Sequence, residues 1–238
     1  IFKGDEIEFP EDGYQGEDIK DLAKEYADLN GDSLVNVSAE ERKKALVDYA
    51  LPKNIKKMQA DMEKYKIFYD KWFFESELHK SGAVKAVVDL LTKKGLTYEK
   101  EGAVWYKNKE VLTQKLLKEG KSQKYIDNLE LKDDVLIRQN GNPTYFTADI
   151  AYHKNKFDRG FTTLIDVWGA DHHGHVMRMK GAMDAIGYDG DKLNVVLMQL
   201  VKLVKDGELV KMSKRTGKAI QLGDLLDEVP VDSARFLF

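Results

Sequence analysis

The chain has 238 residues, of which 42% are hydrophobic and 33% are charged, and its formal net charge is −3 at pH 7. This composition excludes a disordered chain, and no apolar run is long enough to span a bilayer, so no membrane partner is expected. The sequence has no cysteine, which excludes a disulfide partner and a thiolate metal site and suits a cytoplasmic protein. Because the net charge is small, any binding of nucleic acid has to depend on local basic patches.

The first half of the chain is mainly helical by its periodicity and its content of good helix formers. Ser38, followed three residues later by Glu41, predicts a capping box at the start of a long helix. Gly120 interrupts a lysine-rich helical segment. Helices are expected over residues 16–26, 39–65, 83–94 and 108–129, and a short β-hairpin is expected over residues 96–107.

The second half has the pattern of an open α/β sheet. Residues 163–169 form an apolar, strand-like run that ends in a glycine, and a polar cluster over 170–175 separates it from a helical segment over 176–186. Open α/β sheets bind ligands at such corners, where the carboxyl end of a strand lies beside a helix N-terminus. Residues 193–204 then predict a buried strand, and an Asp-Gly pair at 206–207 predicts the turn of a hairpin.

A basic loop, Lys-Met-Ser-Lys-Arg, follows this hairpin at residues 211–215. Two lysines that flank a hydroxyl can neutralise a polyphosphate and follow its charge as a bond breaks. By itself such a loop is more often a solvated surface turn. Its place after the hairpin is expected to bring it near the polar corner at residues 169–175, and this context favours a functional loop.

The order of these segments resembles the second half of a class I aminoacyl-tRNA synthetase catalytic domain. Their amino-acid sequences resemble the arginyl-tRNA synthetase family more closely still. The segments that carry the resemblance are 144–153, 167–175 and 205–215. It is strong over residues 136–238 and looser over 13–19 and 69–76. It implies an α/β fold: residues 136–238 form the second half of a Rossmann-like parallel sheet. Residues 1–135 hold a mainly helical connective insertion with a small β-hairpin and the neighbouring part of the catalytic domain.

The resemblance implies an arginine-binding group of three residues, Tyr145, Asp149 and His172. A guanidinium group calls for a carboxylate that accepts two parallel hydrogen bonds, and Asp149 is the carboxylate of this segment. Tyr145 lies one helical turn earlier and would contact the same substrate side chain, while His172 would close the pocket. A simpler alternative stays open, in which Asp149 caps a helix that begins at Ile150.

The ATP site implied by the resemblance combines the polar corner with the basic loop. Gly169 would let the nucleotide approach the backbone, and Asp171 would hold the ribose hydroxyls. His175 is a further ATP-binding candidate, although a histidine on the first turn of a helix is as often a packed or capping residue. Lys211 and Lys214 would bind ATP and stabilise the pyrophosphate leaving group, and Ser213 would orient the loop as the third catalytic residue.

The implied enzyme is a ligase that forms arginyl-adenylate from L-arginine and ATP and then passes the arginyl group to tRNA(Arg). Mg²⁺ is expected on the triphosphate, and no metal bound by protein ligands is expected. In this family the activation step generally requires bound tRNA. The family's His-Ile-Gly-His motif is expected before residue 1 and its anticodon-binding domain after residue 238. The isolated chain is therefore expected to be an inactive fragment.

Two other functions remain open from the sequence. The Asp-His-His-Gly-His cluster at residues 171–175 has the residue types of a metal-dependent phosphoesterase, in which imidazoles and a carboxylate bind a divalent ion that activates water. Such a site needs further aspartates, and residues 1–160 contain no convincing partner cluster. The third possibility is a module that binds arginine or RNA without catalysis.

Overall fold

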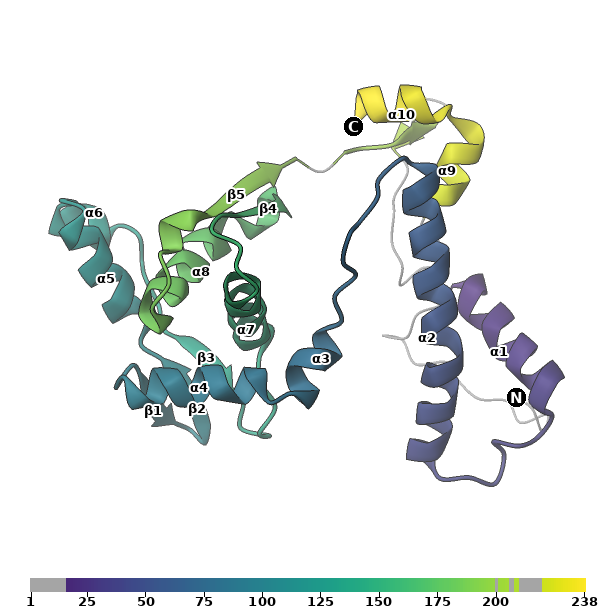
Figure 1. Ribbon diagram of the computed structural model, residues 1–238, viewed down its shortest axis with the longest axis horizontal. Helices are drawn as coiled ribbons and strands as arrows, with labels where there is room; N and C mark the ends of the chain where they lie inside the picture. Colours follow the sequence, from purple (N-terminus) through teal and green to yellow (C-terminus); the bar gives the residue numbers. More distant parts are fainter. Residues whose placement is uncertain (1–15, 200, 206–207, 210–219) are drawn as a thin grey trace. The chain divides into compact units, whose positions relative to one another are not determined.

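The structure is a computed structural model that describes residues 16–199, 201–205, 208–209 and 220–238 (Figure 1). The chain divides into two compact units. A helical unit comprises residues 1–70 and 201–238, and an α/β unit comprises residues 71–200. The division predicted from the sequence, between residues 135 and 136, separates a connective insertion from the second half of the catalytic domain. The division into compact units does not test it, and it stays a prediction.

The helical unit begins with two helices, α1 (Glu17–Asn30) and α2 (Ala39–Lys64). Ser38 and Glu41 form the predicted capping box, because the Glu41 backbone N–H donates to Ser38 Oγ at 3.3 Å and the Ser38 backbone N–H donates to Glu41 Oε2 at 3.0 Å. Tyr26 and Tyr49 pack edge to face between the two helices, with ring centroids 5.1 Å apart. The expectation of two helices here is confirmed.

The end of the chain lies against the last turns of α2 (Figure 1). It forms α9 (Leu222–Glu228) and α10 (Val231–Leu237). Lys66 Nζ donates to Asp232 at 2.6 Å, and the Arg235 guanidinium donates to the Tyr65 carbonyl at 2.9 Å. These contacts join segments more than 160 residues apart in the sequence within one unit.

The predicted strand over 193–204 is wrong in its extent. The structure has β5 (Leu193–Met198) and, after a break, β6 (Val204–Lys205), which pairs antiparallel with β7 (Glu208–Leu209). Strand β5 pairs with β4 (Leu164–Gly169), and Met198 is the partner of the last residue of β4. The ladder ends there because β4 offers no further partner. The predicted turn at 206–207 lies outside the described residues.

The α/β unit contains a three-stranded antiparallel sheet, whose strands are in the order β1 (Thr97–Lys100), β2 (Ala103–Tyr106) and β3 (Asp134–Ile137). It also contains the parallel pair β4-β5. The predicted hairpin over 96–107 is confirmed as β1 and β2. The predicted interruption of the helical segment over 108–129 is also confirmed, because two helices are separated at Gly120, whose φ is +79°. The helices of this unit are α3 (Glu75–Lys80), α4 (Ala83–Lys93), α5 (Asn108–Lys118), α6 (Gln123–Asp127), α7 (Tyr145–Asp158) and α8 (His173–Ile186). Two short 3₁₀ segments, Ala170–His172 and Gly190–Lys192, lie on either side of α8.

The core of this unit lies between helices α4, α7 and α8 and the strands beside them. Helix α4 contributes a stripe of apolar residues at helical spacing, which is why it packs along one face. Helix α8 begins three residues before the predicted start at 176 and links β4 to β5. Fully buried side chains include Val87, Leu91, Leu136, Ile150, Met179, Met183 and Leu193.

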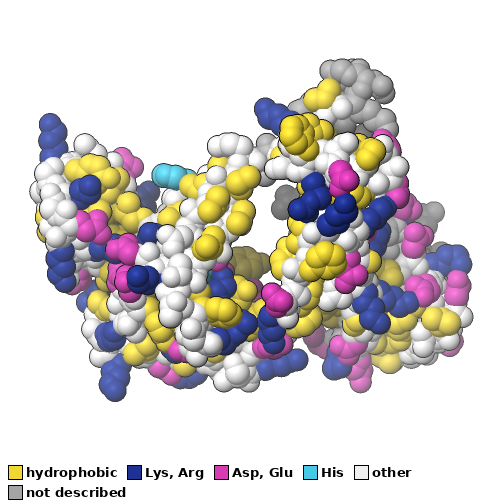
Figure 2. Space-filling view, turned by 45° about the horizontal axis from the view of Figure 1, so that its top comes forward, with side chains coloured by type: hydrophobic (Ala, Val, Ile, Leu, Met, Phe, Trp, Pro, Cys, Tyr) yellow, Lys and Arg dark blue, Asp and Glu magenta, His cyan; other side chains and the backbone are white. Residues whose placement is uncertain are grey.

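The parallel pair β4-β5 is covered on one face only within the described residues. Leu164, Asp166 and Leu193 are buried on the covered face, whereas Ile165 and Val167 on the other face are 69% and 68% exposed. Hydrophobic side chains also reach the surface in Figure 2 (yellow). The expectation of a wholly buried strand after residue 193 is therefore wrong, because β5 alternates between buried and open positions.

Gly190 provides a test of the packing between α8 and the segment that follows it. A Cβ at this position would lie 2.3 Å from the Lys180 carbonyl oxygen, and the Gly190 backbone N–H already donates to Asp184 Oδ1 at 2.7 Å. Gly190→Ala is therefore expected to lower the free energy of unfolding by about 1–3 kcal/mol in chemical denaturation of the full-length protein. The control is Gly174→Ala on the first turn of α8, where a Cβ meets no atom within 4 Å. An equal loss in both variants would contradict the close approach.

Candidate active site

The polar corner forms where β4 ends and α8 begins. Gly169 is the last residue of β4, and a Cβ there would lie 2.4 Å from Asp171 Oδ1. The glycine therefore lets the Asp171 carboxylate fold back over the strand end. The side chains of Asp171 and His172 are 66% and 60% exposed, with 3.8 Å between the Asp171 carboxylate and His172 Nε2. Both are open to a ligand.

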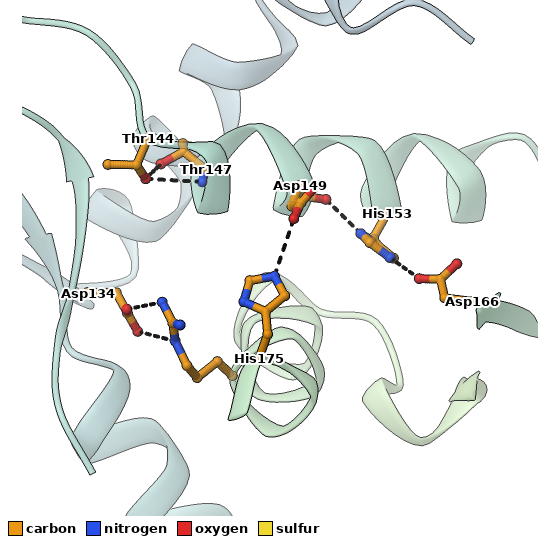
Figure 3. Close-up of polar contacts among 8 residues, drawn as sticks. Asp134, Thr144, Thr147, Asp149, His153, Asp166 and His175 are labelled. Carbon is orange, nitrogen blue, oxygen red and sulfur yellow. Dashed lines mark hydrogen bonds and ion pairs between the residues drawn. The ribbon is translucent and has the colours of Figure 1, made fainter. Parts of the chain in front are cut away.

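Helix α7 lies on the other side of the site (Figure 3). The first turn of this helix is bonded to the backbone of β3. Thr144 is its N-cap, since Thr144 Oγ1 accepts from the Thr147 backbone N–H at 3.4 Å. The hydroxyls of Thr144 and Thr147 donate to the carbonyls of Val135 and Leu136 at 2.8 and 2.7 Å. The alternative in which Asp149 caps a helix is wrong, because Asp149 lies within the helix, five residues after its cap.

Asp149 meets His175 across the gap between α7 and α8 (Figure 3). His175 Nε2 lies 3.2 Å from Asp149 Oδ2, and the two side chains are 17% and 47% exposed. The imidazole is packed against Phe146 and Trp168, with ring centroids 5.5 and 5.3 Å apart. This packing orients the His175 ring toward the Asp149 carboxylate. The carboxylate stays partly exposed, so a ligand can reach it.

The other predicted residues surround this pair to different degrees. Tyr145 lies one turn before Asp149 on α7 and is 78% exposed. The ring of His172 lies 6.4 Å from that of Trp168, which also contacts His175. Trp168 was not predicted as a site residue. Its signal in the sequence is its place two residues after Asp166 on β4, which puts both side chains on the covered face.

Behind Asp149 lies a buried polar cluster that the sequence analysis also missed. His153 on α7 and Asp166 on β4 are 3% and 7% exposed, and His153 Nε2 contacts Asp166 Oδ2. Lys156 Nζ donates to Asp166 Oδ1 at 2.7 Å. Burial by itself would raise the pKa of Asp166, but hydrogen bonds from His153 and Lys156 outweigh this effect and hold that pKa below its ordinary value. The signal in the sequence was a carboxylate at an inward position of an apolar strand.

The three catalytic residues predicted from the sequence belong to the basic loop. Lys211, Ser213 and Lys214 lie outside the described residues. Their predicted catalytic roles stay predictions.

The metal-site alternative receives no support from the polar corner. His175 turns toward Asp149 instead of joining Asp171 and His172. Across the described residues, no group of three or more histidine, aspartate or glutamate side chains is arranged to hold a metal ion. None of the helices in the same ranges has the length and apolar character needed to cross a membrane.

The sequence of this chain matches that of a known protein family over nearly its whole length. The model described as "tRNA synthetases class I (R), catalytic domain" matches residues 17–237. The chain belongs to this family. The predicted resemblance and the predicted α/β fold class are therefore confirmed.

Individual members of the family are similar over the whole chain. An arginine-tRNA ligase of Ruminiclostridium cellulolyticum is 52% identical over 240 residues, which covers 100% of this chain and 40% of that protein. One of Caldanaerobacter subterraneus subsp. tengcongensis is 55% identical over 236 residues and is covered to 39%. The chain thus spans about two fifths of the length of the curated relatives it matches.

Solved structures of the family share the fold. The structure of a putative arginyl-tRNA synthetase from Campylobacter jejuni has a TM-score of 0.77 and 37% identity, and the match covers 98% of this chain and 46% of that one. Arginyl-tRNA synthetase from Thermus thermophilus has a TM-score of 0.60 at 20% identity, covering 88% and 38%. At that identity the likeness concerns the fold alone.

Proposed function

We propose that this class I synthetase chain is the part of an arginine-tRNA ligase that binds arginine and completes the ATP site. The full-length protein forms arginyl-adenylate and pyrophosphate from L-arginine and ATP, and then transfers the arginyl group to a terminal ribose hydroxyl of tRNA(Arg). The observation that carries the proposal is the Asp149 carboxylate, held by His175 at an accessible corner of a synthetase fold. We expect the enzyme to act in the cytoplasm.

The arginine pocket is built around Asp149. An ionised carboxylate has about four acceptor positions, and His175 occupies one, so enough remain for the two parallel N–H donors of a guanidinium group. Tyr145 and His172 have exposed rings that can pack against the substrate side chain. Charge and fork geometry together favour arginine over lysine, whose ammonium cannot form the paired contact, and over uncharged citrulline.

The ATP site is proposed at the strand end and the basic loop. Asp171 is exposed beside Gly169, so its carboxylate is free to accept hydrogen bonds from ribose hydroxyls. His175 remains an ATP-binding candidate, and its contact with Asp149 would connect the two parts of the site. Lys211 and Lys214 neutralise the pyrophosphate as it leaves, with Ser213 orienting the loop.

Catalysis in this proposal consists of positioning and charge stabilisation. The arginine carboxylate attacks the α-phosphate, and the bond to pyrophosphate breaks without a covalent enzyme intermediate. Mg²⁺ is expected on the triphosphate, because this ion is usually held there by phosphate and water oxygens and not by a dedicated set of protein ligands.

Amino-acid-dependent ATP–pyrophosphate exchange tests the proposed function. We expect exchange by the full-length protein with arginine, dependent on tRNA, and none with lysine or citrulline. The 238-residue chain alone is expected to show no exchange, because it spans only about two fifths of the length of the arginine-tRNA ligases that it matches. No exchange by a folded full-length protein, with arginine binding retained, would point to a non-catalytic binding module. Exchange by the chain alone would overturn the prediction that it is inactive.

A further inference from the structure

The buried cluster behind Asp149 connects the proposed arginine pocket to the sheet (Figure 3). His153 Nδ1 lies 2.7 Å from the backbone carbonyl oxygen of Asp149, one turn earlier on the same helix. The other ring nitrogen, Nε2, contacts the Asp166 carboxylate on β4. Asp149 is therefore held at its side chain by His175 and at its carbonyl by His153.

Hydrogen-bond accounting sets the protonation state of His153. A carbonyl oxygen only accepts, so Nδ1 must carry a hydrogen. An ionised carboxylate also only accepts, so Nε2 must carry one too. Lys156, 2.7 Å from the second Asp166 oxygen, favours the ionised carboxylate over a protonated one. Both contacts are satisfied together when each ring nitrogen carries a hydrogen.

We propose that His153 is a buried imidazolium that acts as a positioning residue, tying the Asp149 turn of α7 to Asp166 on β4 so that the carboxylate is preset for a guanidinium substrate. The role in substrate binding rests on the proposed function, whereas the protonation state does not. Neither His153 nor Asp166 is exposed enough to touch a substrate, since they are 3% and 7% exposed.

The surroundings of the ring support a dedicated ionic link. Within the described residues, the His153 ring contacts one charged side chain, that of Asp166 on β4. The Asp166 carboxylate also contacts Lys156 on α7. Tyr152 and Trp168 present aromatic rings to His153 at centroid distances of 5.9 and 6.2 Å. A buried ion pair is seldom more stabilising than a well-packed apolar pair of the same volume. The role of this pair is therefore positional. Two hydrogen bonds from one rigid ring fix the position of the Asp149 turn relative to β4.

Nitrogen-15 NMR of histidine-labelled full-length protein tests the protonation state. The His153 signals are identified by their loss in His153→Gln. At neutral pH both ring nitrogens are expected to show the shifts and attached hydrogens of an imidazolium, with the exposed ring of His172 as the solvent-accessible reference. A single unprotonated nitrogen on His153 would overturn the proposal whatever the enzyme's activity.

Steady-state exchange kinetics test the positioning role. Asp166→Asn and His153→Gln are each expected to raise the KM for arginine about tenfold and leave the KM for ATP within about twofold. His153→Asn places an amide nitrogen near the position of Nδ1, so it keeps the bond to the Asp149 carbonyl but loses the link to β4. An intermediate rise in KM is expected for it.

The matched control is Asp184→Asn on α8, which breaks a partly buried ion pair with Lys115 at 2.6 Å far along the chain from Asp149. It is expected to lower stability without changing the KM for arginine. Equal changes in the KM for arginine and the KM for ATP in the His153 and Asp166 variants would mean that the cluster only supports the fold. An equal rise in the KM for arginine in the control would mean the same. If the wild-type protein does not activate arginine at all, the proposed function fails, and the NMR result alone decides the state of His153.

Discussion

Replacing Asp149 with asparagine is expected to raise the KM for arginine by about 100-fold or more, with the KM for ATP little changed. The substitution keeps the shape of the side chain but removes its charge and one acceptor. Each hydrogen bond to a charged group contributes about 1.5–3 kcal/mol, and the guanidinium would lose the pairing of two such bonds. The contact with His175 would also change, because an amide oxygen attracts an imidazole N–H less strongly than a carboxylate does.

The same substitution should weaken selectivity as well as affinity. Citrulline has the shape of arginine without the charge, so it loses less than arginine when the carboxylate disappears. The arginine-to-citrulline ratio of kcat/KM, measured by pyrophosphate exchange, is therefore expected to fall.

Asp158→Asn is the control for Asp149→Asn on the same helix. Asp158 pairs with Lys154 at 2.6 Å and accepts from the Tyr188 hydroxyl, at the far end of α7. Its replacement should leave both KM values unchanged. A loss of arginine binding in the control as large as in Asp149→Asn would show that the helix, and not its carboxylate, determines affinity.

Lys214→Ala in the full-length protein is expected to lower the rate of adenylate formation by about 100-fold or more, while arginine binding changes little. Lys214 belongs to the basic loop outside the described residues, so this prediction depends on the chemistry of the motif. Negative charge builds on the pyrophosphate only as its bond to the α-phosphate breaks. A cation that follows this charge therefore stabilises the transition state more than the bound substrates.

Lys202→Ala is the control for the basic loop. Lys202 is an exposed lysine in the same helical unit, nine residues before Lys211. Single-turnover measurement of adenylate formation should show no change in this variant. If Lys214→Ala instead lowers arginine binding and rate by the same factor, the lysine supports the structure of the site and not the transition state.

The sequence by itself determined the features whose causes are local. The Ser38–Glu41 capping box, the β1-β2 hairpin and the break at Gly120 depend on hydrogen bonds and dihedral preferences within a few residues, and the structure contains all three. The helical spacing of Tyr145 and Asp149 is equally local. The family itself was identified from short segments, and the family model confirms it.

Tertiary structure decided whatever depends on partners distant in the sequence. Strand β5 ends at Met198 because its partner β4 ends at Gly169. The strand propensity of residues 193–204 carries no information about the length of that partner. The pairing of Asp149 with His175 spans 26 residues, and that of His153 with Asp166 spans 13, from different elements in each case. Spacing along one helix or strand predicts which residues share a face, but it does not say which face of another element will meet them. That choice is made by the packing of α7 and α8 against β4, and for this reason the orientation of Asp149 emerged only from the folded chain.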